Sequence, residues 1–155
     1  MKIRILAVGT RMPAWVDAGA NDYLRRLPAQ FRTAIEEIRP VRRSAGAEAR
    51  AVVEEGARIL ESLSRTDFAV ALDVRGRSMS TEQLAQWLGE RMRDGRDLAF
   101  IIGGADGLSQ PCLARCELQW SLSPLTFPHG LVRVLLVEQL YRATSLLQGH
   151  PYHRA

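Results

Sequence analysis

Residues 98–107, which read LAFIIGGADG, decide the fold class. The five apolar residues that begin this segment are typical of a strand buried on both faces of a sheet. The glycines that follow let the backbone turn tightly and let a ligand approach it closely, because glycine has no side chain in the way. A buried strand that enters a glycine turn predicts a parallel sheet with a ligand site at its carboxyl end.

Further strands and helices alternate on both sides of this segment. Apolar or alternating patterns predict strands at residues 2–8, 33–38, 68–72 and 118–122. Apolar residues at helical spacing predict helices at residues 14–27, 48–63, 109–116 and 131–147. Ser80 and Gln83 have capping-box spacing, which predicts another helix that continues to Met92. The alternation predicts one α/β domain over residues 1–155, with a mainly parallel sheet flanked by helices.

The composition excludes several classes of protein. The 155 residues are 46% hydrophobic and 25% charged, which is ordinary for a globular chain. The two cysteines, Cys112 and Cys116, are too few for a disulfide-rich secreted scaffold, and we expect free thiols and no metal site. No apolar run reaches the roughly 18 residues of a membrane span. We therefore expect a soluble cytoplasmic protein.

The positive charge is concentrated in the first half of the chain. The formal net charge is +4, and residues 1–66 hold 12 basic and 8 acidic residues. Arginine suits phosphate because its guanidinium is a planar fork, so a surface that faces RNA or DNA is one interpretation and a solvated face is the other. Six of the arginines fall between residues 25 and 43, namely Arg25, Arg26, Arg32, Arg39, Arg42 and Arg43.

Three consecutive predicted strands end in unusual loops, at residues 72–73, 103–107 and 121–129. Because the carboxyl ends of parallel strands lie along one edge of a sheet, we expect these loops to converge on one ligand site. The glycine spacing, G-G-x-x-G, matches neither the dinucleotide fingerprint nor the P-loop. A tight turn is therefore an alternative interpretation of this loop taken alone.

Two further segments carry chemistry. Residues 121–129 combine two prolines and three hydroxyls with large apolar side chains, which suits a small ligand with an aromatic ring. His129, ahead of the last helix, is a candidate base, phosphate contact or helix cap. The tail, residues 150–154, reads HPYHR and can stack on bases, bind phosphate and exchange protons, or it is a frayed terminus.

The chain resembles one bacterial family along its whole length, the ribosomal RNA large subunit methyltransferase H enzymes. This family lies within the SPOUT, or trefoil-knotted, methyltransferases. The motifs that carry the resemblance are Ala7-Val8-Gly9-Thr10, Leu72-Asp73, Ile102-Gly103-Gly104, Ser121-Leu122-Ser123, Thr126-x-Pro128-His129, Leu131-Val132-Arg133 and His150-Pro151-Tyr152-His153-Arg154.

The resemblance implies an S-adenosylmethionine-dependent enzyme that methylates N3 of a pseudouridine, position 1915 of 23S rRNA, in the assembled 70S ribosome. It also implies a homodimer and a C-terminal trefoil knot. No periodicity argument predicts a knot, because threaded chains are very rare. It implies that the cofactor site comprises Leu72, Gly103, Gly104, Leu122, Ser123, Pro124, Leu125, Thr126 and Phe127.

The N3 proton must leave during the reaction, and a nearby base or cation assists its departure. Our hypothesis is that His153 or Arg154 of the tail, together with Tyr152, orients the base and assists deprotonation. The tail that does so belongs either to the same chain or to the partner subunit. His129 and Arg133 are the second choices.

Two other functions are alternatives. The first is a knotted methyltransferase that acts on another RNA, such as tRNA. The second is a non-catalytic ribosome- or RNA-binding module that has kept the fold. The second alternative predicts damaged cofactor loops, yet Gly103, Gly104, Thr126 and Pro128 are intact.

Overall fold

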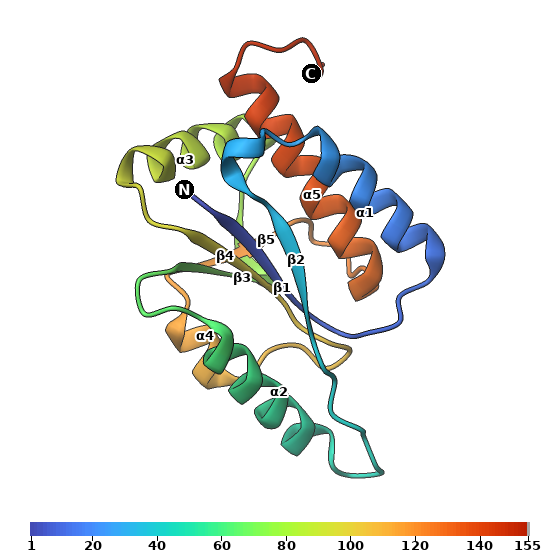
Figure 1. Cartoon of the computed structure of the whole chain (residues 1–155). Coiled ribbons are helices and arrows are strands. Elements are labelled where there is room, and N and C mark those ends of the chain that lie inside the picture. Colours follow the sequence, from blue (N-terminus) through green and yellow to red (C-terminus); the bar gives the residue numbers. More distant parts are fainter. Residues whose placement is uncertain (155) are drawn as a thin grey trace.

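A computed structural model describes residues 1–154 as a five-stranded sheet with helices on both faces (Figure 1). The strand order is β2-β1-β4-β3-β5, and every neighbouring pair is parallel. The predicted α/β fold with a parallel sheet is therefore confirmed. The strands are β1 (Ile3–Val8), β2 (Ala34–Ile38), β3 (Phe68–Ser78), β4 (Leu98–Ile102) and β5 (Leu118–Ser121).

The helices divide between the two faces of the sheet. On one face α5 (His129–Leu147) packs against both α1 (Ala14–Arg26) and α3 (Thr81–Asp94). On the other face α2 (Glu48–Ser62) packs against the short α4 (Gln110–Arg115) (Figure 1). A single 3₁₀ turn, η1 (Ala29–Phe31), leads into β2.

The central strand β4 explains the apolar run in the sequence, since all five of its residues are buried. Phe100 lies on the α3 and α5 face between Trp87 and Trp120, with ring centroids 6.2 and 6.1 Å apart. Ile101 points to the opposite face and packs with Ile59 of α2 and Cys112 of α4. The strand contributes to a core on each face and so must be apolar throughout.

The ends of α3 follow the local sequence. The Ser80 hydroxyl accepts from the Gln83 N–H at 3.1 Å, and the Ser80 N–H donates to Gln83 Oε1 at 2.8 Å. This reciprocal pair is the predicted capping box, which satisfies two backbone donors that the first helical turn leaves free. The helix ends at Gly95, whose φ of +81° suits glycine.

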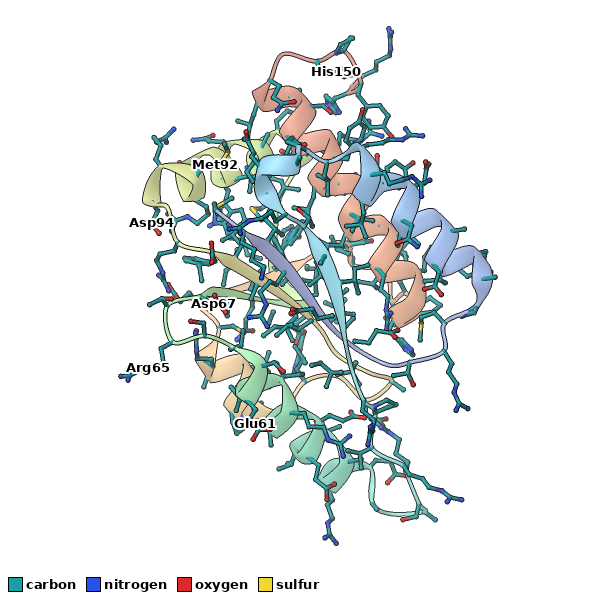
Figure 2. The ribbon with its side chains drawn as sticks, in the orientation of Figure 1. Glu61, Arg65, Asp67, Met92, Asp94 and His150 are labelled. Atoms are coloured by element: carbon teal, nitrogen blue, oxygen red, sulfur yellow. The ribbon has the colours of Figure 1, made fainter. Side chains whose placement is uncertain are left out.

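A buried carboxylate closes the turn before β3, at the amino edge of the sheet. Asp67 is 2% exposed and accepts hydrogen bonds from the Ser64 N–H at 2.8 Å and from Arg4 Nη1 at 3.1 Å (Figure 2). Because a buried carboxylate is costly unless it is paired, this turn is fixed by Arg4 of β1.

β3 is longer than the predicted strand at residues 68–72. Trp120 of β5 lies opposite both Leu72 and Arg77, so residues 73–76 leave the ladder as a bulge. The chain rejoins the ladder at Arg77, directly after Gly76, where a Cβ atom would lie 2.6 Å from the carbonyl carbon of Gln119. The prediction ended the strand at residue 72 because the bulge depends on close contact with the backbone of β5, which is distant in sequence. α5 likewise begins at His129, two residues before the predicted start.

Candidate active site

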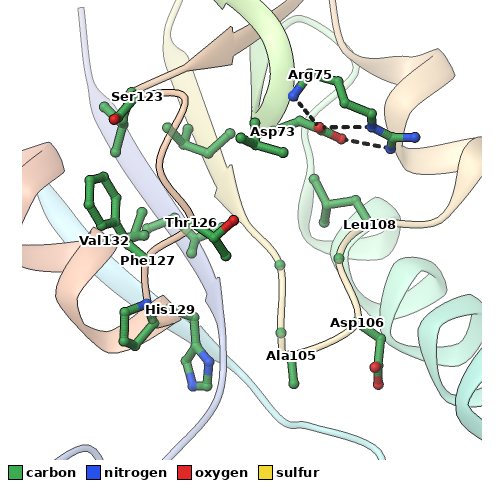
Figure 3. A pocket seen from close by; sticks show the side chains of 18 of the residues that line it. Asp73, Arg75, Ala105, Asp106, Leu108, Ser123, Thr126, Phe127, His129 and Val132 are labelled. Atoms are coloured by element: carbon green, nitrogen blue, oxygen red, sulfur yellow. Dashed lines mark hydrogen bonds and ion pairs between the residues drawn. The ribbon is translucent and has the colours of Figure 1, made fainter.

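A cavity of about 730 Å³ lies at the carboxyl ends of β4 and β5, beside the bulge of β3 (Figure 3). Residues 72–75 at the start of the β3 bulge form one part of its wall. Residues 102–108, which include the glycine loop at 103–107, form a second part. Residues of the segment between β5 and α5 form the third. The structure thus brings together the three loops that the sequence predicted to converge.

All but one of the predicted cofactor residues line this cavity. The exception is Pro124, which is exposed and lies outside the lining. The lining also includes Val74, Arg75 and Leu108, which the sequence analysis did not single out. The predicted residues that do line the cavity are Leu72, Gly103, Gly104, Leu122, Ser123, Leu125, Thr126 and Phe127.

The two serines between β5 and α5 hold the shape of that segment. The Ser121 hydroxyl donates to the Ser123 carbonyl oxygen at 2.9 Å, and the Ser123 hydroxyl accepts from the Leu125 N–H at 3.0 Å. Among residues 1–154 the hydroxyl of Thr126 makes no hydrogen bond, and it is available to a ligand. Leu125 is 68% exposed, so an apolar side chain stands uncovered at the mouth of the cavity.

The glycine loop turns back on itself beside the cavity. The Gly107 N–H donates to the Gly104 carbonyl oxygen at 3.1 Å, and Gly107 has a φ of +81°. A Cβ atom on Gly103 would lie 2.9 Å from the Gly107 carbonyl oxygen. Glycine is therefore required at both positions, for different reasons.

The bulge of β3 presents an ion pair to the cavity. Asp73 accepts from the backbone N–H of Arg75 at 2.9 Å and from its guanidinium at 3.1 and 3.2 Å (Figure 3). The side-chain hydrogen bond from Arg75 lowers the pKa of Asp73, so this group is a carboxylate at neutral pH.

His129 and Arg133 lie one turn apart on α5 but have different surroundings. His129 lines the cavity, and its Nε2 atom would lie 3.4 Å from a Cβ atom added to Gly9. Arg133 is 2% exposed, donates to the Gly9 carbonyl oxygen at 2.9 Å and to Glu37 at 2.8 Å, and does not line the cavity. In this structure Arg133 anchors α5 to the ends of β1 and β2.

The tail lies at the opposite end of α5, a helix whose 19 residues span about 27 Å. Figure 2 shows His150 beyond the last turn of this helix. Tyr152 Oη lies 3.3 Å from Glu138, and burial raises the pKa of Tyr152 to about 12. Within one chain the structure therefore does not bring Tyr152, His153 or Arg154 to the cavity.

Both ring nitrogens of His153 have neighbours in this chain. Nδ1 lies 3.4 Å from Arg142 Nη1, and Nε2 lies 3.0 Å from Glu82 Oε1. Because a guanidinium only donates, Nδ1 is the acceptor and Nε2–H donates to Glu82 when the ring is neutral. His153 must exchange at least one of these contacts before it can accept a proton from a substrate.

The clustered arginines do not form one surface. Arg25, Arg26 and Arg32 precede β2 and lie at the amino edge of the sheet, where Asp22 pairs with Arg25 at 3.5 Å and with Arg26 at 3.0 Å. The arginines of residues 39–43 follow β2 and lie at the carboxyl edge, where the cavity opens.

The two cysteines, Cys112 and Cys116, are free thiols, as the sequence predicted. Burial raises the pKa of Cys112 and raises that of Cys116 to about 12. In the described part of the chain, no group of three or more His, Cys, Asp or Glu residues could hold a metal ion. No helix there has both the length and the apolar character that a membrane span requires.

Comparison with known proteins places this chain in a class. The family model described as "Predicted SPOUT methyltransferase" matches residues 1–153, and the chain belongs to the SPOUT methyltransferase family. Within that class, relatives that match the whole chain are named Ribosomal RNA large subunit methyltransferase H. The resemblance found in the sequence is thereby confirmed.

Two of these relatives match the chain from end to end. The one from Alkalilimnicola ehrlichii is 56% identical over 156 residues and covers 100% of both chains. The one from Thioalkalivibrio sulfidiphilus is 54% identical over 155 residues and covers 99% of both chains.

Solved structures with low sequence identity share the fold. A probable methyltransferase from Bordetella pertussis is 16% identical, with a TM-score of 0.58 over 92% of this chain and 95% of that chain. A Legionella pneumophila putative methyltransferase, solved with bound cofactor SAM, is 11% identical, with a TM-score of 0.50 over 92% and 66% of the two chains.

Proposed function

We propose that the chain is an S-adenosylmethionine-dependent methyltransferase that methylates N3 of a pseudouridine in 23S rRNA. The observation that carries this proposal is the convergence of three loops on one cavity, in a chain whose full-length relatives are named for methylation of large-subunit ribosomal RNA. The proposal extends to a single domain over residues 1–155 that acts in the cytoplasm.

The residues of the cavity fit this cofactor. Its volume of about 730 Å³ lies within the usual range for small-molecule sites. The glycine loop exposes backbone groups without side chains, and Leu72, Leu122 and Phe127 supply apolar walls for a purine ring. Two carboxylates, Asp73 and Asp106, also lie in the lining, and each is paired with an arginine, Arg75 and Arg43 respectively.

The bound cofactor supplies an electrophilic methyl group on a sulfonium. The chain itself binds and aligns: backbone groups near Leu72, Gly103 and residues 122–127 would hold the adenine, and the apolar side chains of the lining would exclude water from it. Because methyl transfer requires alignment of three atoms and little acid–base chemistry, positioning supplies much of the rate.

Removal of the N3 proton needs a base or a cation beside it. His129 is the imidazole that the chain places at its own cavity. His153 and Arg154, the first choices from the sequence, lie a helix length away and act in the reaction only when a second copy brings its tail to this cavity. We therefore include a homodimer in the proposal, together with a trefoil knot in the C-terminal third of the chain.

The proposal is tested by transfer of labelled methyl from S-adenosylmethionine to 70S ribosomes, 50S subunits and free rRNA that lack the modification. Label on 70S ribosomes alone, mapped to N3 of the pseudouridine, is the expected result. Label on another RNA, such as tRNA, would show that the proposed substrate is wrong. Binding to ribosomes without cofactor binding or transfer would favour a non-catalytic module.

A further inference from the structure

Arg43 joins three segments of the chain that are far apart in sequence. Its Nε atom donates to Asp106 of the glycine loop at 2.7 Å. Its two terminal nitrogens donate to the two carboxylate oxygens of Glu55 on α2, at 2.6 and 2.9 Å. Such a two-pronged contact fixes the orientation of the guanidinium as well as its position.

The Glu55 end of this bridge is rigid. Glu55 is 2% exposed and also accepts from the Val41 N–H at 2.9 Å, while Arg43 donates to the Val41 carbonyl oxygen at 2.9 Å. Burial alone would raise the pKa of Glu55, but the hydrogen bonds from Arg43 and the Val41 N–H outweigh burial and lower it. The pair is therefore charged and held at neutral pH.

The Asp106 end of the bridge belongs to a loop with few other attachments. Three of the five residues at 103–107 are glycine, and one is alanine. Gly104 rests against the bridge, since a Cβ atom there would lie 3.5 Å from Glu55 Oε1 and 3.7 Å from Arg43 Nη2. Asp106 is the residue of this loop whose side chain forms an ion pair with another segment within residues 1–154.

We propose that Arg43 is a positioning residue of the cofactor site, which holds the glycine loop in its ligand-binding shape through Asp106. A glycine-rich loop without this contact samples many conformations, and binding must then order it at a cost in affinity. The inference rests on the proposed function, since the ligand concerned is S-adenosylmethionine.

The first measurement needs no ligand. Hydrogen exchange of the Gly107 amide, which is bonded to the Gly104 carbonyl oxygen, reports the order of the loop in the free protein. We expect about tenfold faster exchange in Asp106→Ala and in Arg43→Ala. Arg50→Ala is the matched control, because Arg50 lies on α2 in an exposed pair with Glu54. In Arg50→Ala the Gly107 amide should exchange at the same rate as in the unaltered chain.

The second measurement is calorimetric binding of S-adenosylmethionine. Asp106→Ala should bind about tenfold more weakly with an unchanged Tm, and KM for the cofactor should rise while kcat at saturation is kept. Adding Asp106→Ala to a chain that already carries Arg43→Ala should not weaken cofactor binding further. Arg43→Ala leaves the Glu55 carboxylate buried without its partner. The same comparison is therefore repeated in the double variant Arg43→Ala/Glu55→Gln, which removes that unpaired charge.

The outcomes separate this inference from the proposed function. An Asp106→Ala effect that persists without Arg43 would mean that Asp106 contacts the ligand directly, and the inference would be wrong. Unchanged exchange and affinity in Asp106→Ala would also overturn it. Absence of cofactor binding by the unaltered chain would overturn the proposed function, while the exchange data would still report whether Arg43 orders the loop.

Discussion

Arg133 donates a hydrogen bond to the carbonyl oxygen of Gly9, and the two residues are 124 positions apart in the chain. The bond ties α5 to the end of β1, one turn after His129, the residue that brings an imidazole to the cavity. The guanidinium also pairs with Glu37 just before the end of β2. One buried side chain thus sets where the last helix begins relative to two strands.

We predict that Arg133→Met lowers the free energy of unfolding by about 2–3 kcal/mol, because it leaves the Gly9 carbonyl oxygen without its partner in a buried site. Methionine keeps most of the aliphatic stem and removes the guanidinium, with its donors and its charge, so the ion pair to Glu37 is lost as well. Denaturant unfolding measures the change. Arg93→Ala, at an exposed position on α3, is the control and should change stability by less than about 0.5 kcal/mol. Equal stability of all three proteins would show that the bond to Gly9 contributes nothing.

The position of the tail gives a prediction about subunits. Chains with His153→Ala and Arg154→Ala in the tail should transfer no methyl group, although they bind the cofactor normally. Chains with Gly103→Leu should be inactive because the added side chain meets the Gly107 backbone. Co-expression of the two inactive chains should restore about a quarter of the activity. About half of the dimers contain one chain of each kind, and in each of these one of the two sites has both an intact cavity and an intact tail. No recovery would mean that the tail does not act across subunits.

The arginines at the carboxyl edge give a prediction about RNA. Arg39 and Arg42 are exposed, and within residues 1–154 neither forms an ion pair, so both can contact phosphate. Replacing both with glutamine should weaken ribosome binding and reduce the slope of log K against log salt by about 2. Arg50→Gln is the comparison, since that residue pairs with Glu54 on the same face of α2. Equal slopes in the two proteins would show that Arg39 and Arg42 are solvated and do not contact phosphate.

The buried carboxylate of Glu55 gives a prediction about pH. Its pKa in the folded chain is lowered from the ordinary 4.5, so its stabilising effect is complete above that value and is lost as the pH falls through the folded pKa. Glu55→Gln should be less stable than the unaltered chain at pH 7, and the difference should shrink as the pH falls below about 4.5. Unfolding curves across pH measure it. Glu54→Gln, next to it in an exposed pair, should show almost no difference at any pH.

Much of the fold follows from local sequence. The apolar run of β4 and the capping box of Ser80 and Gln83 depend on neighbours within a few positions, and the structure agrees with both predictions. The convergence of the three loops was predictable for a topological reason, because parallel strands place their carboxyl ends at one edge.

The remaining features depend on partners far away in sequence. The bulge of β3 depends on the backbone of Gln119 beside Gly76, and no local pattern in residues 73–76 indicates it. Arg43 belonged to a basic cluster in the sequence, but its guanidinium pairs with Glu55 and with Asp106, which is 63 positions away. The distance of His153 from the cavity also became visible only once the direction of α5 was known.

The outer strands of the sheet limit how a second copy can attach. β5 is four residues long and pairs with a bulged neighbour, while β2 carries Glu36 and Glu37, each held by an arginine of an adjoining element. Short, irregular or charged margins resist the addition of another strand from outside. A continuous sheet across two molecules is therefore disfavoured, and contacts between the copies of the proposed dimer would use helices and loops and not paired edge strands.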